Sequence, residues 1–363
     1  MSTSIRRFLP VLFTAICLIA SPLRSFAQDH SADIPVTENV DDTGDLDEHR
    51  LAETEEEFNI GEMIMHHIAD SHEWEFAHGV VLPLPVILYS PDRGLEVFMS
   101  SKFHNEGHEY NGYHLIHGDT EAIVPVDESR TVYDLSITKN VASMILSAII
   151  LMLIFISVAK AYQNRQGKAP RGFQSAMEVL ILFIRDEVVK PNIGPNYQKY
   201  LPYMLTLFFF ILVNNLLGLL PGAANVTGNI AITMTLAVIT FIIVHINSNK
   251  HYWAHLVKPT GVPIALLPIM IPVEIVGVFM KPFSLMIRLF ANMTAGHIIL
   301  LSLFGLIFIF KSLVIAPVIS AFALFMNFIE IMVAFIQAFI FTLLSSMYIG
   351  SAIEDNHEAD HGH

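Results

Sequence analysis

The stretch IPVEIVGVFMKPFSLMIRLFANMTAGHIILLSLFG, residues 271–305, combines long apolar runs with four ionisable side chains. It lies inside an apolar segment, residues 262–310, that is 49 residues long. About 20 residues are enough for a helix to cross the bilayer perpendicularly. The segment therefore predicts either two short spans that fold back on each other or one strongly tilted membrane helix.

The ionisable side chains of this stretch fall on two sides of a helix. Glu274, Lys281 and Arg288 are seven residues apart, and seven residues turn a helix by about 700°, close to two full turns. They form one stripe that continues to Asn292. His297 follows Arg288 by nine residues, which is about half a turn out of phase and roughly 13 Å along the axis. Because ionisable side chains are costly inside a membrane, each is a candidate functional residue, and Arg288 and His297 are expected to serve different compartments.

A second apolar segment, residues 312–353, is 42 residues long and carries one polar stripe. Asn327, Glu330 and Gln337 fall at spacings of three and seven residues. Two membrane helices with one polar stripe each are expected to turn these stripes toward each other, with water between them, rather than toward lipid.

The overall composition is that of a membrane protein. Hydrophobic residues make up 53% of the 363 residues and charged residues 15%, and the mean hydropathy is +0.54. This excludes an ordinary soluble enzyme.

Residues 141–159, 201–220 and 230–246 predict three further spans. Residues 173–190 alternate apolar and charged positions at helical spacing and predict a helix at the membrane interface. The expected fold class is an all-α integral membrane protein with a small extramembrane N-terminal region.

Basic residues in the loops predict the topology. Residues 160–171 contain four Lys or Arg, and the loop after the third span contains Lys250 and Lys258. The loop between the second and third spans contains none. Basic loops stay in the cytoplasm, so the N-terminal region is expected in the periplasm.

The first 27 residues have the form of a secretory signal peptide. Arg6 and Arg7 precede an apolar run of about 13 residues, and Ser25-Phe26-Ala27 suits a cleavage site. An uncleaved anchoring helix is the alternative, although the run is short for a span. The single cysteine, Cys17, lies in this run, so a cleaved chain would have neither disulfides nor thiolate metal sites.

Charge separates the remaining chain into an acidic and an apolar part. Residues 28–139 contain 25 Asp or Glu against 5 Lys or Arg, a net charge of −20. Residues 28–58 predict an acidic disordered linker, and residues 59–137 a periplasmic region with short strands. Residues 138–353 form the expected membrane domain, and residues 354–363 an acidic, histidine-containing tail.

Three motifs resemble one protein family. They are SLMIRLFANMTAGH at 284–297, IQAFIF at 336–341 and NLLGLLP at 215–221. Together with the order and lengths of the spans, they are similar to subunit a of the rotary (F-type) ATP synthase membrane sector, the stator half of its proton channel. The resemblance covers about residues 138–353.

The resemblance implies five spans, of which the two long segments are tilted helices that wrap a ring of c subunits. It implies a multi-pass protein of the bacterial inner membrane, with the C-terminus in the cytoplasm. The implied partners are the c-subunit ring, a b-type peripheral stalk, the remaining ATP synthase subunits and the lipid bilayer. It also implies that the chain is not an enzyme by itself.

The resemblance further assigns candidate roles to three ionisable residues. The family's essential arginine falls on Arg288, which is expected to face the carboxylates of the c ring. His297 and Glu330 are expected to be proton relays in the outer half-channel. Some bacterial members carry this histidine and carboxylate the other way round, which suggests that one imidazole and one carboxylate share a cavity.

The remaining candidates are accessory positions on the proton pathway. Four amide side chains are expected to hold water there: Asn215, Asn292, Asn327 and Gln337. Glu274 and Lys281 are expected to line the inner exit. Structural alternatives stay open: an ion pair with Glu274 for Arg288, an interfacial anchor for Lys281, and a hydrogen bond to a neighbouring helix for Asn215.

The alternative function is a polytopic cation (zinc) transporter that uses a histidine-rich periplasmic collector. Ten histidines lie between His30 and His117. The chain lacks the repeated halves that are typical of transporters, and no H-x3-H pair among these histidines is joined by a second one at the spacing of a zinc site. An intramembrane hydrolase is disfavoured because neither G-x-S-x-G nor H-E-x-x-H occurs in the apolar segments. We therefore expect no metal, no cofactor and no nucleic-acid partner.

Overall fold

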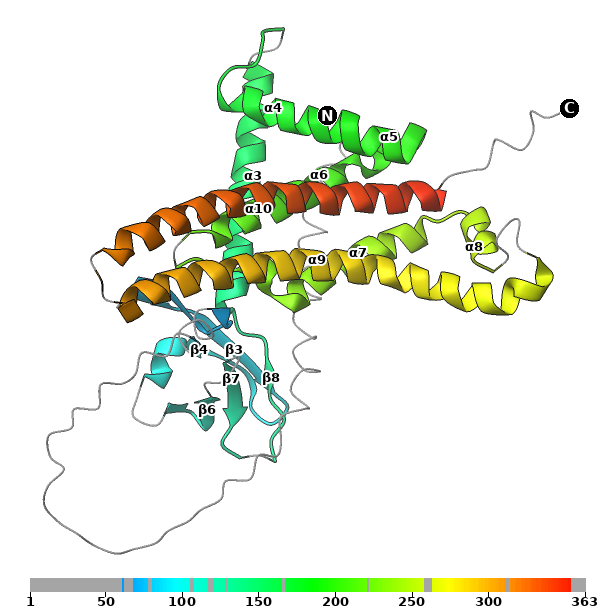
Figure 1. Cartoon of the computed structure of the whole chain (residues 1–363). Helices are drawn as coiled ribbons and strands as arrows, with labels where there is room; N and C mark the ends of the chain where they lie inside the picture. The colour runs from blue at the N-terminus through cyan, green and yellow to red at the C-terminus, as the bar shows by residue number, and fades with distance from the viewer. Residues whose placement is uncertain are drawn as a thin grey trace, which may run out of the picture.

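A computed structural model describes residues 61, 68–77, 80–104, 108–116, 121–127, 129–164, 167–220, 222–257, 263–310, 312 and 314–353. The predicted signal peptide, acidic linker and C-terminal tail lie outside the described residues. The described chain has a part built of strands, followed by a part built of helices (Figure 1).

The strands form three small antiparallel sheets. Their bounds are β1 Glu73–Ala77, β2 Val80–Pro83, β3 Pro85–Ser90, β4 Gly94–Met99, β5 Glu109–Tyr110, β6 Tyr113–Ile116, β7 Ala122–Pro125 and β8 Tyr133–Asp134. The sheets have the orders β1-β2, β4-β3-β8 and β5-β6-β7. Asn111 and Gly112 join β5 to β6 with φ values of 55° and 81°, as a two-residue hairpin turn with both residues left-handed requires.

Alternation along the strands builds one small core. Val86 and Leu88 on β3 are fully buried, whereas Tyr89 between Leu88 and Ser90 is exposed. The core is completed by four further buried side chains: Phe103, Tyr113, Leu115 and Ile123. This confirms the short strands that the sequence indicated for this region.

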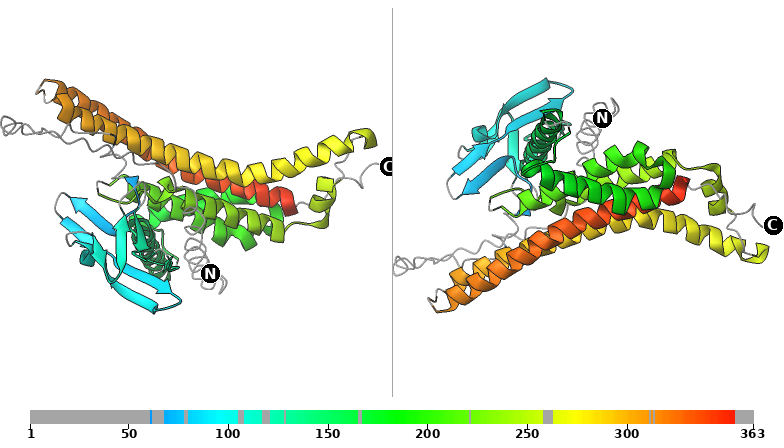
Figure 2. Two further views of the ribbon diagram at one scale, coloured as in Figure 1. Left: turned by 90° about the horizontal axis from the view of Figure 1, so that it is seen from below. Right: turned by 90° about the horizontal axis from the view of Figure 1, so that it is seen from above.

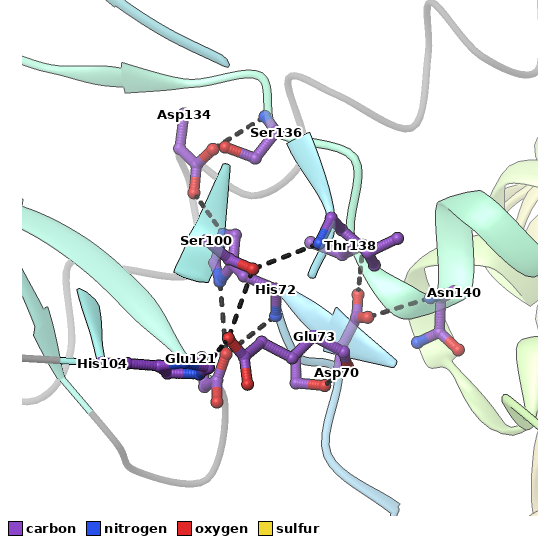
Figure 3. Close-up of polar contacts among 12 residues, drawn as sticks. Asp70, His72, Glu73, Ser100, His104, Glu121, Asp134, Ser136, Thr138 and Asn140 are labelled. Atoms are coloured by element: carbon purple, nitrogen blue, oxygen red, sulfur yellow. Dashed lines mark hydrogen bonds and ion pairs between the residues drawn. The ribbon is translucent and has the colours of Figure 1, made fainter. Parts of the chain in front are cut away.

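A buried polar network joins the strands to the first membrane helix, α3 (Lys139–Asn164) (Figure 3). His72, which is 1% exposed, lies between two carboxylates. Its Nε2 is 3.2 Å from Asp134 Oδ2, and its Nδ1 is 3.4 Å from Glu121 Oε2. Asp70 accepts hydrogen bonds from Thr138 Oγ1 at 2.9 Å and from the backbone N–H of Asn140 at 3.1 Å. Asp70 thus satisfies a donor at the start of α3, as an N-terminal cap does.

The helical part confirms the predicted membrane architecture. After α3 come α4 (Phe173–Phe183), a π-helical turn (Ile184–Val189), α5 (Lys190–Ile193), α6 (Tyr197–Gly218), α7 (Ile230–Ile246), α8 (Lys250–Val257), α9 (Leu267–Phe310) and α10 (Ile315–Ile353). In the described part of the chain, four helices are long and apolar enough to cross a membrane. There are five if the bent α7–α8 pair counts as one span.

The two long apolar segments are single helices and do not fold back. Helix α9 has 44 residues and α10 has 39, which correspond to about 66 and 58 Å at 1.5 Å per residue. A hydrocarbon core of about 30 Å can contain such helices only if they are strongly tilted. Figure 1 shows that they run side by side across the nearly perpendicular α3, and in Figure 2 both bow in the same direction.

Helices α9 and α10 form one layer, and α6 and α7 lie behind it (Figure 2). Helix α10 packs on α9 and α6, and α7 packs on α9. A side-chain carbon at Gly350 would collide with the Asn192 carbonyl oxygen, so the end of α10 can touch α5 only because this residue is glycine. Large apolar side chains of α9 and α10, such as Phe279, Leu324 and Phe328, are more than half exposed.

The environment of His72 predicts a stability that depends on pH. Burial alone would lower the pKa of His72, but hydrogen bonds and charge attraction from Asp134 and Glu121 outweigh it and raise the pKa to about 9. The protonated imidazole therefore stabilises the folded strands fully below pH 6.5, and this contribution, about 3 kcal/mol, is lost as the pH rises through about 9.

We expect His72→Gln to lower the melting temperature of the strand region at pH 7 and to remove its decrease between pH 7 and 10. Trp74 fluorescence of the full chain in detergent, in a Trp253→Phe background, measures this transition. Identical pH profiles for the His72→Gln variant and the parent would refute the role of the imidazole.

Candidate functional site

Arg288 lies near the middle of α9, where it is half-buried. Its Nη2 donates to Ser284 Oγ, one turn earlier, at 3.4 Å. Within the described residues Arg288 forms no ion pair. Glu274, the partner of the structural alternative, is 14 residues away on the same helix, about 21 Å along the axis. The guanidinium is therefore held in the apolar layer without a neutralising carboxylate from the described chain, which is costly and indicates a function.

Glu330 on α10 is buried against α9. Its side chain is 5% exposed, and neither carboxylate oxygen has a hydrogen-bond partner in the described part of the chain. A side-chain carbon at Gly296 of α9 would lie 2.8 Å from Glu330 Oε1. Gly296 thus provides the space that the carboxyl occupies. His297 is the next residue of α9 and is partly buried. Because Gly296 contacts the Glu330 carboxyl, His297 follows directly on the point of contact between α9 and Glu330.

Asn215 connects three elements beside Glu330. It is fully buried on α6, its Nδ2 donates to the Ala334 carbonyl on α10 at 3.2 Å, and its Oδ1 accepts from Thr227 Oγ1 at 2.7 Å. Ala334 is one helical turn after Glu330. The hydrogen bond between helices that the sequence left open for Asn215 is therefore present.

The other amide candidates lie in different surroundings. Gln337 is buried on α10, Asn327 is half-buried, and Asn292 is exposed on α9. The structure does not turn the whole α9 stripe toward α10 as we expected: Glu330 meets α9 at Gly296, while Asn292 stays exposed. The contact at Gly296 has a steric reason, since a side-chain carbon at this position would lie 2.8 Å from Glu330 Oε1.

Toward the N-terminal end of α9, Lys281 borders a second polar region. The Lys281 Nζ lies 5.4 Å from the centre of the Tyr348 ring of α10. Both residues line a pocket together with His245 of α7 and Tyr252 of α8. His245 Nε2 and Tyr252 Oη are 3.4 Å apart, and Glu274, which is half-buried, lies close to Tyr252.

Sequence reasoning missed His245, Tyr252 and Tyr348. A signal existed for His245, because it is an ionisable residue near the end of an otherwise apolar helix. The two tyrosines carry no comparable signal, since aromatic residues are common near membrane interfaces.

The two polar regions lie on opposite sides of Arg288 along α9. Lys281 precedes Arg288 by seven residues, about 10 Å, and Gly296 follows it by eight, about 12 Å. Arg288 therefore separates a region with Lys281, Tyr348 and His245 from a region with Glu330, Gly296 and His297.

The described residues contain no group of three or more His, Cys, Asp or Glu side chains that could hold a metal ion. His66 and His67, part of the histidine-rich sequence, lie outside the described residues. Nothing in the described chain supports the alternative of a zinc transporter.

Comparison with protein families divides the chain at the start of α3. The family described as ATP synthase A chain matches residues 141–350. A domain of unknown function, DUF8433, matches residues 63–143, which include the strands.

Related proteins are similar to this chain over most of its length. The ATP synthase subunit a of Chloroherpeton thalassium is 49% identical over 239 residues, which cover 64% of this chain and 71% of the relative. The ATP synthase subunit a of Chlorobium phaeobacteroides strain BS1 is 43% identical over 315 residues, 85% of this chain and 80% of the relative. The protein of the same name from Anaeromyxobacter sp. is 39% identical over 322 residues, which cover 86% of this chain and 74% of the relative.

The tilted α9 and α10, the motif around Arg288 and these relatives agree, and the chain belongs to the ATP synthase A chain family.

Proposed function

We propose that this chain is the proton-translocating stator subunit of an F-type ATP synthase, with Arg288 facing the c-ring carboxylates between two half-channels. The observation that carries the proposal is the position of Arg288 between two separate polar regions of one tilted helix. The chain is non-catalytic by itself, and ATP chemistry takes place elsewhere in the complex.

The outer half-channel is built around Glu330 and His297. A carboxyl that is buried without a partner exchanges protons readily with a nearby imidazole or water, because no fixed hydrogen bond holds its proton in place. Histidine titrates nearest to neutral pH and suits the role of relay. Asn215, Asn327 and Gln337 orient water without titrating, and Asn292, exposed near Arg288, contacts the ring.

The inner half-channel leads from the ring past Lys281 to the pocket with His245 and Tyr252. Glu274 lies at its far end, toward the cytoplasm. A proton released from the ring on this side encounters polar side chains from α7, α8, α9 and α10.

Arg288 makes rotation obligatory. Its guanidinium stays protonated even when desolvated, whereas an ammonium group loses its charge more easily. A fixed cation favours the ionised form of a ring carboxylate beside it and therefore promotes proton release. The same charge repels protons that would cross directly from one half-channel to the other.

The exposed apolar layer of α9 and α10 is the surface that the ring covers, and lipid covers the rest. A b-type peripheral stalk holds the chain against the torque of the ring, within the bacterial inner membrane. In this assembly the strand region lies in the periplasm and the C-terminus in the cytoplasm.

Replacement of Arg288 by alanine is expected to abolish ATP-driven proton pumping and ATP synthesis in membrane vesicles, because the ring carboxylates lose the cation that drives proton release. The soluble ATPase head, once detached, is expected to hydrolyse ATP at the parental rate. Arg185→Ala is the matched control, because Arg185 is partly exposed and paired with its neighbour Asp186, and it should pump normally. Coupled pumping by the Arg288→Ala variant would refute the assignment.

Exchange of the relay pair tests the shared cavity. We expect the double variant His297→Glu, Glu330→His to retain more proton pumping than either single variant, because it keeps one carboxyl and one imidazole in the same space. Fluorescence quenching of a pH-sensitive dye in vesicles measures the rates, normalised to membrane-bound ATPase. Equal losses in all three variants would rule out a shared cavity.

A further inference from the structure

The strand region is attached to the loop between α6 and α7 as well as to α3. Trp74 on β1 is buried, and its indole N–H donates to the Gly222 carbonyl at 2.8 Å. Gly222 has a φ of 76°, the left-handed conformation that favours glycine. This bond joins two points of the chain that are 148 residues apart.

The same loop is bonded to the membrane helices that surround Glu330. Asn225 Nδ2 donates to the Met293 carbonyl of α9 at 3.4 Å. Thr227 donates to Asn215 of α6, and Thr294 Oγ1 of α9 donates to the Gly228 carbonyl at 3.3 Å. The loop thus bonds to α9 two to three residues before Gly296, the residue that faces the Glu330 carboxyl.

A second attachment fixes the segment that carries Trp74. Asp70 caps the start of α3, and the backbone N–H of Lys139 donates to the Ser71 carbonyl at 2.8 Å. His72 is held by Glu121 and Asp134 from other parts of the strand region (Figure 3). Residues 70–74 therefore connect the rigid start of α3 to the loop, and α3 itself packs on the loop residues 226–228.

We propose that the strand region acts as a brace for the mouth of the outer half-channel, with Trp74 as the positioning residue that sets the loop against α9. The brace rests on the proposed function of the membrane helices, because only that function makes the region around Glu330 a proton entrance. Trp74 does not contact the proton. It fixes the loop, the loop fixes Asn215 and the α9 backbone at Met293, and these fix the space around Glu330.

The test uses the assembled ATP synthase with Trp74→Phe, which keeps an aromatic ring and removes the donor. Loop position is read from the rate at which a maleimide labels Val226→Cys in the purified complex, in a Cys17→Ser background. Val226 is fully buried in the loop, and Cys17 is the single cysteine of the sequence. Tyr133→Phe, an exposed ring of the same strand region, is the matched control.

We expect Trp74→Phe to increase the labelling rate about fivefold, the effect of losing one buried hydrogen bond. It should also shift the dependence of ATP synthesis on the pH of the proton-entry side, with no shift on the exit side. A purely structural weakening of the protein would not separate the two sides. Tyr133→Phe is expected to change neither property, and all rates are normalised to membrane-bound ATPase.

Thr227→Val provides a second, independent variant, because it releases the loop from Asn215 and leaves Trp74 intact. It should raise the labelling rate in the same way, and it covers the case in which Trp74→Phe fails to assemble. The brace is overturned if the Trp74→Phe complex has the parental labelling rate and the parental pH dependence. Where Trp74→Phe does not assemble, the brace is overturned if the Thr227→Val complex has the parental labelling rate.

The Arg288→Ala complex separates this inference from the proposed function. It is expected to lose pumping with unchanged labelling of Val226→Cys. If it pumps normally, the proposed function fails, even where Trp74→Phe still moves the loop.

Discussion

The structure depends on the cost of placing charge in an apolar layer. Arg288 has no neutralising carboxylate among the described residues, and Glu330 is buried without a hydrogen-bond partner. Charged or unpaired polar groups in an apolar layer are strongly unfavourable unless another group or a function compensates for them. In the proposed function, their compensation is the c ring, whose carboxylates pass Arg288, and the water and imidazole that reach Glu330. The membrane part therefore holds two energetically unfavourable groups, Arg288 and Glu330, apart from each other on α9 and α10.

The tilt of α9 and α10 follows from length, and their close contact follows from small residues. Helices of 44 and 39 residues cannot stand upright in a bilayer, so they lie across it and offer one long apolar face. Gly296 lets the Glu330 carboxyl approach α9, and Gly350 lets the end of α10 approach Asn192. The region around Glu330 thus lies about 12 Å beyond Arg288, and the region around Lys281 lies on its other side.

Much of the fold could be predicted from local sequence, whereas the contacts that organise the site could not. Hydropathy indicated the spans, and the span predicted at residues 230–246 coincides with α7. The periodicity of the α9 stripe did not reveal that Glu330 meets Gly296, because a glycine carries no hydropathy signal. Local sequence also did not reveal that His72 pairs with Glu121 and Asp134, or that Trp74 bonds to Gly222. These pairs join residues that are 49 to 148 positions apart in the chain.

In the proposed function, Arg288 prevents protons from passing directly between the two half-channels. The most direct test is passive proton conductance in vesicles that retain the soluble head and contain no nucleotide, so that the ring cannot turn. We expect the parental complex to hold a proton gradient and an Arg288→Gln complex to dissipate it. An Arg288→Gln complex that holds the gradient as well as the parent would refute this role of Arg288.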